Sequence, residues 1–247
     1  MIKFFRKIRQ GLISDNKFSK YLLYAVGEIV LVVIGIFIAL QLNLWSENRK
    51  LDEVRQTYYH QLLDDLNKDK VYIENTIAKL DSFRLNYNNY IETFKEPNLY
   101  PNQALENLFS VNFTSLVIGF NTSTIETLEN TGDIKLLAPH IRNKLAELKR
   151  SQDFIVKISY GNDNNKNNIL EKASLLIGSI TLTERLSNQE FLAEYLEPEF
   201  NYPKLFLIME AVHAWKNASE EITLKNIKDL LKDNSEIQEL IIKELKD

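Results

Sequence analysis

The sequence of 247 residues contains no cysteine, and it has only seven glycines, five prolines and three histidines. The absence of cysteine excludes disulfide bonds, thiolate catalysis and cysteine-ligated zinc sites. Scarce glycine and proline leave few positions for tight turns, whereas the abundance of Leu, Ile, Lys and Glu favours long helices over strands. We therefore expect an all-α fold.

Signatures of catalysis are missing as well. The sequence has no phosphate-binding glycine loop, no HExxH motif and no legible Ser/His/Asp spacing. His60 and Asp64 are four residues apart and can share one helix face, but two ligands without a third predict a metal site only weakly. We interpret the pairs Asp64–Asp65 and Glu220–Glu221 as solvated faces. We expect a non-enzymatic protein with no catalytic residue, no metal and no cofactor.

The stretch from Tyr21 to Leu44 is the dominant feature that is present. Its centre, Ile29 to Leu40, has no polar side chain, and Glu28 is the only charged residue of the whole stretch. A helix needs roughly 20 mostly apolar residues to cross the hydrocarbon core of a bilayer. The alternative is a helix at the centre of a large soluble protein, since no polar face is left for water. We predict a transmembrane helix over residues 21–44.

Charge sets the expected orientation of this helix. The first 20 residues carry six basic side chains and one acidic side chain, whereas residues 21–247 have a net charge of −9. The positive-inside rule then places the amino terminus in the cytoplasm and the body outside. Residues 1–20 are either a basic amphipathic helix on the cytoplasmic leaflet or simply the positive flank of the span. A cleaved signal peptide is the main rival, but no small-x-small site follows the apolar run.

Three residues of the span are candidates for a contact between transmembrane helices. Gly35 and Ala39 form a small-xxx-small step on the helix face that also carries Glu28. Small residues at this spacing let two helix backbones approach closely. Glu28 either takes part in that contact or lies shallow enough to reach the headgroups. We expect Glu28, Gly35 and Ala39 to contact a second copy or another membrane protein.

The sequence also resembles a known family. The opening MIKFFRKIRQ, the stretch NKFSKYLLYAVGEIVLVVIGIFIALQ and the exit Trp45–Arg49 resemble uncharacterised single-span membrane proteins of Bacteroidetes, which carry a domain of unknown function. Glu126–Leu137 is similar to the soluble part of that family, whereas Leu44 and Ser46 stand where asparagines are expected. The resemblance implies an envelope protein of a Gram-negative bacterium, anchored in the inner membrane, and it implies no activity.

The body after the span is expected to begin with a long stalk helix. Apolar residues recur at three- and four-residue steps from Leu51 to Phe94, with one seven-residue gap between Leu66 and Ile73. The gap predicts a kink near Asn67–Lys70. Six tyrosines accompany this helix, and we interpret them as bundle core with hydroxyls at the rim, or as the lining of a small-ligand pocket: Tyr58, Tyr59, Tyr72, Tyr87, Tyr90 and Tyr100.

Further helices are predicted over residues 102–113, 124–130, 139–160, 169–182, 189–196, 203–217, 222–231 and 236–245. Gly132 is expected to cap one of them in the left-handed conformation, and Asn234–Ser235 to start the last. Thr114–Asn121 is expected to be a buried loop or a helix start. The polar run Gly161–Asn168 is expected to be a loop or an exposed helix start.

Together these features predict three segments, namely a basic cytoplasmic segment (1–20), a transmembrane helix (21–44) and a periplasmic all-α domain (45–247). The expected partners are the lipid bilayer and either a second copy or another envelope protein, while the acidic body argues against nucleic acid. The first functional hypothesis is a membrane-anchored scaffold or partner-binding protein of the cell envelope. The alternative is a periplasmic ligand-sensing bundle that signals through the span to a separate partner.

Overall fold

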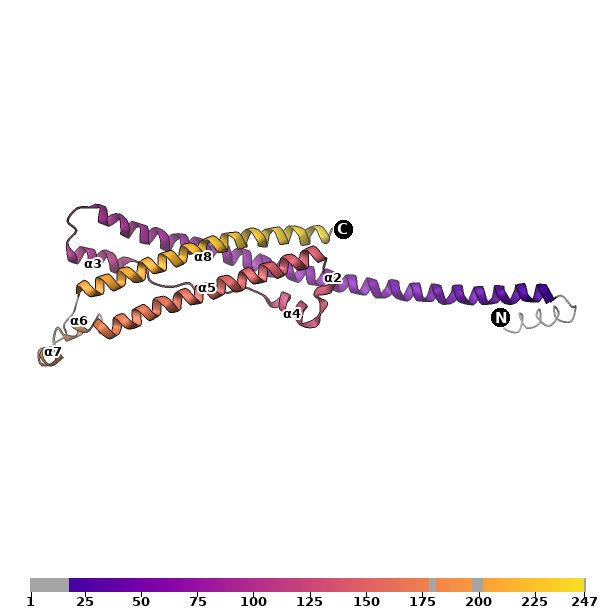
Figure 1. Ribbon diagram of the computed structural model, residues 1–247, viewed down its shortest axis with the longest axis horizontal. Helices are drawn as coiled ribbons and strands as arrows, with labels where there is room; N and C mark the ends of the chain where they lie inside the picture. Colours follow the sequence, from indigo (N-terminus) through magenta and orange to yellow (C-terminus); the bar gives the residue numbers. More distant parts are fainter. Residues whose placement is uncertain (1–17, 178–180, 197–201, 247) are drawn as a thin grey trace. The chain divides into compact units, whose positions relative to one another are not determined.

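The computed structural model describes residues 18–177, 181–196 and 202–246, and these residues form helices and connecting segments without any strand. The all-α prediction is therefore confirmed. In chain order the elements are α2 (Phe18–Glu92), η1 (Thr93–Lys95), α3 (Pro101–Ser110), α4 (Ser123–Thr131), η2 (Asp133–Leu136), α5 (Pro139–Ile177), α6 (Leu182–Leu186), α7 (Glu190–Leu196) and α8 (Tyr202–Glu244) (Figure 1). The chain divides into an amino-terminal unit, Met1–Thr57, and a helical unit, Tyr58–Asp247.

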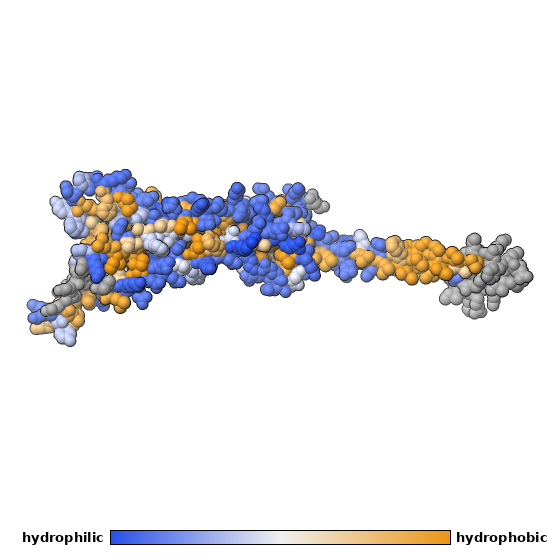
Figure 2. Space-filling model, in the orientation of Figure 1, coloured by the Kyte–Doolittle hydropathy of each residue, from blue (hydrophilic) through white to orange (hydrophobic). Residues whose placement is uncertain are grey.

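The amino-terminal unit contains the apolar part of α2. The large apolar side chains described between Leu22 and Trp45 are 49–70% exposed. None of the most apolar window, which has a mean hydropathy of 2.5, is buried. Figure 2 shows this segment as a continuous hydrophobic surface. Among the described residues, α2 is the one helix long and apolar enough to cross a membrane, a property that a signal sequence shares.

The helical unit is built on three long helices. Helices α2 and α5 run in the same direction, and α8 runs antiparallel to both (Figure 1). Their facing apolar side chains form one main core, which the short helix α4 also joins. From α2 the core includes Tyr59, Leu62, Leu66, Ile73 and Leu80; from α5 it includes Ile141, Leu145, Leu148 and Ile155; from α8 it includes Leu224, Ile227, Leu230, Ile237 and Ile241.

A buried carboxylate fills the gap in the apolar pattern of α2. Asp69 lies between Leu66 and Ile73 and is almost fully buried. Its oxygens accept hydrogen bonds from the backbone N–H of Asn121 at 2.9 Å and from Gln152 Nε2 at 2.8 Å. Because these partners compensate for the lost hydration, Asp69 can occupy a core position. Helix α2 passes through Asn67–Lys70 without a break, so the gap marks a polar core position.

Three predicted interruptions are absent. Gly161–Asn168, predicted as a loop or helix start, lies inside α5, and the three carboxy-terminal helices are the single helix α8. Asn234 is therefore not a cap but a fully buried residue in mid-helix. Its Nδ2 donates to the carbonyl oxygen of Leu66 at 3.1 Å, and its Oδ1 accepts from Gln238 at 3.0 Å. A partner on α2 thus satisfies an amide that the sequence pattern assigns to a helix start.

An extended strap, residues 111–122, connects α3 to α4 and lets α5 run parallel to α2. The prediction of a buried loop is confirmed at its centre, where Ile118 packs into the core. The strap has no regular hydrogen-bonding partner strand, so side chains of α2 take that role. Asn86 accepts from the N–H of Asn112 at 2.8 Å, and the Tyr72 hydroxyl accepts from the N–H of Gly119 at 3.3 Å.

Local signals set the ends of the shorter helices, and the left-handed cap at Gly132 is confirmed. Pro101 occupies the first turn of α3, where its missing N–H is not needed. Gly132 follows α4 with φ of 77°, the left-handed conformation that glycine adopts without a Cβ clash. The start of α4 is held from α2: Asp65 accepts hydrogen bonds from the backbone N–H of Thr124 at 3.2 Å and from the side chains of Asn121 and Thr124. The interpretation of Asp65 as a solvated residue is therefore wrong.

Because of this arrangement, Asp64 and Asp65 should contribute differently to the free energy of unfolding. We expect Asp65→Ala to lower the free energy of unfolding by about 1–3 kcal/mol, because several donors at the start of α4 lose their acceptor. Asp64→Ala is the matched control: Asp64 is exposed and pairs in the described chain with Lys68, one helical turn away, so its loss should lower the free energy of unfolding far less than the loss of Asp65. Urea denaturation followed by circular dichroism measures both values. Equal losses for the two variants would contradict the capping role of Asp65.

Candidate functional site

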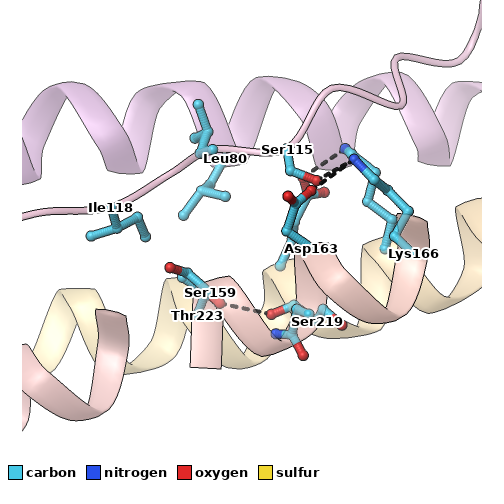
Figure 3. A pocket seen from close by; sticks show the side chains of 12 residues that line it. Leu80, Ser115, Ile118, Ser159, Asp163, Lys166, Ser219 and Thr223 are labelled. Carbon is cyan, nitrogen blue, oxygen red and sulfur yellow. Dashed lines mark hydrogen bonds and ion pairs between the residues drawn. The ribbon is translucent and has the colours of Figure 1, made fainter. Parts of the chain in front are cut away.

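A small cavity in the helical unit is lined by charged and hydroxyl-bearing side chains from three directions (Figure 3). Helix α2 contributes Leu80, and the strap contributes Ser115 and Ile118, so one side is largely apolar. Helices α5 and α8 supply the polar side. Its polar lining consists of Ser115, Ser159, Asn162, Asp163, Lys166, Lys216, Ser219, Glu220 and Thr223.

Lys166 ties α5 to the strap at one end of the cavity. Its ammonium group donates to the carbonyl oxygen of Phe113 at 3.0 Å and to the hydroxyl of Ser115, and it lies 3.0 Å from a carboxylate oxygen of Asp163. These three acceptors match the three N–H donors of a lysine. These contacts satisfy the whole donor set of Lys166, and its ammonium group can therefore be buried.

A second ion pair lies along α8. The ammonium of Lys216 is 2.6 Å from a carboxylate oxygen of Glu220 and 4.5 Å from the centre of the Phe83 ring. Both charged side chains are nearly buried, so Glu220 is not the solvated residue that the sequence predicted. Its neighbour Glu221 is exposed, as expected of a solvated face, and its Oε2 lies 3.6 Å from Nη2 of Arg84.

The pKa values of the Glu220 and Asp163 carboxylates are shifted in opposite directions. Burial raises the pKa of Glu220 above its usual range, and the nearby Lys216 opposes this shift. The pKa of Asp163 is lowered, first by the hydrogen bond from Ser115 and then by Lys166. The pKa of Asp163 is thus lowered beside Lys166, whereas at Glu220 the cations of Lys216, Arg84 and Lys166 offset only part of the rise in pKa caused by burial.

The size of the cavity limits what it can hold. Its volume is about 40 Å³, enough for about one to three water molecules at roughly 10–15 Å³ each. Pockets for drug-sized ligands measure about 300–1,000 Å³. The arrangement is thus suited to a few waters or a very small polar solute, and the hydrogen bonds of Lys166 to Phe113 and Ser115 hold α5 against the strap.

Sequence analysis missed this cluster although a signal was present. Lys216, Glu220 and Thr223 follow the three- and four-residue steps that carry Val212, Leu224 and Ile227 into the core of α8. A periodicity search restricted to apolar residues passes over them. Polar residues that fall on the same helix face as the apolar ones, with a lysine and a glutamate four residues apart among them, would have identified this cluster.

Other predicted candidates do not converge on one site. His60 is exposed, Asp64 pairs with Lys68, and among the described residues no group of three acidic or histidine side chains is placed to hold a metal ion. Glu28, Gly35 and Ala39 lie on the exposed part of α2 in the amino-terminal unit. A Cβ added at Gly35 would meet nothing within 4 Å, so that face leaves room for another helix.

The tyrosines of α2 serve the core rather than one pocket. Tyr59 is fully buried, and its hydroxyl accepts from the backbone N–H of Ala138 at 3.2 Å. Tyr90 donates to Glu210 at 2.5 Å, and Tyr58 donates to Asp133 at 2.8 Å. Tyr100 is exposed. The interpretation as core residues is confirmed for Tyr59 and Tyr90, whereas Tyr58 is partly buried at the edge of the core.

Comparison with protein-family models, curated proteins and solved structures finds no match to this chain. The resemblance of residues 1–50 to the Bacteroidetes family therefore stays a prediction.

His213 makes the helical unit sensitive to acid. It is 1% exposed on α8, and neither ring nitrogen has a hydrogen-bond partner among the described residues. Burial, with a smaller contribution from Lys216, lowers the pKa of His213 from 6.5 to about 4. Between these two pKa values the unfolded chain binds a proton that the folded chain does not, so acidification favours unfolding. The full difference in pKa corresponds to a loss of roughly 3 kcal/mol in the free energy of unfolding.

We expect His213→Phe to raise stability at pH 7, because an unpartnered buried nitrogen is removed, and to reduce the loss of stability between pH 6.5 and 4. Chemical denaturation at several pH values measures how steeply the free energy of unfolding changes with pH. The slope is compared between variants because Glu220, with its raised pKa, makes acidification favour folding, opposite to the effect of His213. His60→Gln, at an exposed position, is the control and should keep the parental slope. A parental slope in His213→Phe would contradict this account.

Proposed function

We propose that this protein is a single-pass membrane protein that presents a helical scaffold, or partner-binding domain, in the cell envelope and catalyses no reaction. The single observation that carries the proposal is the uncovered apolar part of α2. An exposed helical surface of this length costs about 25 cal/mol per Å² of apolar area in water, and no other part of the described chain covers it. Lipid is the environment that removes this cost.

The proposed topology follows from the charge distribution. Six basic residues precede the apolar run, which supports a cytoplasmic amino terminus with residues 1–20 inside, residues 21–44 in the bilayer and residues 45–247 in the periplasm. The resemblance to Bacteroidetes envelope proteins supports the inner membrane of a bacterium as the location. The acidic character of the body supports a protein partner over nucleic acid.

Extraction experiments test the membrane anchor against a cleaved signal peptide. We expect the full-length chain, at its full mass of 28.8 kDa, to sediment with membranes after an alkaline carbonate wash and to be released by detergent. A chain that sediments only before the wash is peripheral. A mature chain that lacks the apolar run, or an intact chain in the supernatant, would overturn the proposal.

The proposed span contact predicts a second result. Gly35→Leu and Ala39→Leu should weaken self-association or partner association in mild detergent, because the larger side chain prevents close approach of two helix backbones. Val30→Leu, on the opposite face of the helix from Glu28, is the matched control and should not change the mass of the complex. Analytical ultracentrifugation or light scattering reads out that mass. An unchanged complex in both small-residue variants would remove the contact formed by Glu28, Gly35 and Ala39.

Ligand sensing is the second candidate function. The convergence of Lys216, Glu220 and Ser219 on one cavity supports it, since such polar groups orient a bound solute. A volume of about 40 Å³ restricts the ligand to a few heavy atoms. A sensor of this kind would signal through the span to a separate cytoplasmic partner. The cavity is small for that role, and the scaffold remains the better-supported proposal.

A further inference from the structure

We propose that helix α7 is a docking surface for another envelope protein that offers an apolar groove rimmed by Lys or Arg. This inference rests on the proposed function and names the partner surface of the scaffold. Helix α7 lies between α6 and α8, at the end of the helical unit where α5 ends and α8 begins (Figure 1). Its sequence is EFLAEYL.

The pattern of α7 is that of a helix that packs against protein. Phe191 and Tyr195 are four residues apart, as are Leu192 and Leu196, so at 100° per residue the four side chains form one apolar stripe about 140° wide. A stripe of this width normally faces a core. Glu190 and Glu194 border the aromatic side of the stripe.

This stripe is uncovered. Phe191 is 87% exposed and Tyr195 is 84% exposed, and Leu192 and Leu196 are 47% and 44% exposed. Neither buried core cluster of the described residues includes a residue of α7. The same end of the unit also exposes Leu175 near the end of α5 and Leu207 near the start of α8. Several large apolar side chains therefore meet water at one end of the unit, and such exposure marks interaction sites.

Helix length gives an independent reason to expect a partner. Isolated helices shorter than about 12 residues are marginal in water and usually depend on tertiary packing. Helix α7 has seven residues, and its apolar side chains receive no packing from the two cores. A partner that covers Phe191 and Tyr195 would supply this packing. Rigid aromatic side chains are also the residues that most often dominate binding energy at interfaces.

The charges decide which occupant fits. Glu190 and Glu194 give the border of the stripe two negative charges, so a basic rim on the partner is complementary. A second copy of α7 would bring two more glutamates to the interface and no Lys or Arg to pair with them. An anionic lipid surface would be repelled by the same two carboxylates. A protein groove with Lys or Arg at its edge is the occupant that satisfies both the apolar stripe and its acidic border.

Site-specific photocrosslinking in the native host tests this inference. The full-length chain carries p-benzoylphenylalanine in place of Phe191 or Tyr195, and in place of Phe154 as a matched control. Phe154 is also an aromatic residue of the helical unit and is 51% exposed, but it lies on α5. We expect positions 191 and 195, but not 154, to crosslink one protein partner.

A charge-reversal arm tests the chemistry of the partner. Glu190→Lys combined with Glu194→Lys should lower the crosslink yield about tenfold, equivalent to about 1.4 kcal/mol, while leaving membrane sedimentation unchanged. Mass spectrometry of the crosslinked peptides should place the contact beside Lys or Arg residues of the partner. Crosslinks to a second copy or to lipid, yields equal to that at position 154, or insensitivity to charge reversal would each overturn the proposal.

The two proposals fail differently. A chain that sediments with membranes after the carbonate wash but gives no specific crosslink at α7 loses the docking surface and keeps the anchor. A soluble chain loses the anchor whatever α7 binds.

Discussion

No part of the described chain covers the apolar run of α2, and the rest of the structure depends on this constraint. In the described chain, the large apolar side chains from Leu22 to Trp45 are all exposed. Their exposure to water is energetically costly. A soluble protein would fold other elements over such a helix. This chain uses its remaining long helices, α5 and α8, to cover only the part of α2 that lies in the helical unit.

Within the helical unit, buried polar groups rather than apolar residues fix the positions of the helices and the strap relative to one another. Apolar packing tolerates sliding of one helix along another, whereas a buried carboxylate or amide tolerates only positions where its partners lie. Asp69 joins α2 to the strap and to α5, Asn234 joins α8 to α2, and Lys166 joins α5 to the strap. These contacts set the register of a bundle whose crossover is an extended segment.

The sequence predicted what depends on local pattern and missed what depends on distant partners. The long apolar run, the helical class and the left-handed Gly132 follow from hydropathy and from backbone conformation. Asp69 meets Gln152 across 83 positions of sequence, and Asn234 meets Leu66 across 168. No single-sequence pattern reports such pairs, so both polar residues were assigned to a kink or a cap. Lys216, Glu220 and Thr223 of the cavity were missed for a different reason: their helical phase is legible in the sequence, but a search for apolar periodicity passes over polar residues.

The central claim is that lipid covers the apolar run and that the helical unit lies outside the cytoplasmic membrane. Because the chain has no cysteine, single cysteines report on this with a membrane-impermeant maleimide applied to spheroplasts. The account predicts labelling of Ser82→Cys in intact spheroplasts, of Ser14→Cys only after lysis, and of Val33→Cys only in denaturing detergent. Labelling of Val33→Cys without detergent, or of positions 14 and 82 from the same side, would contradict it.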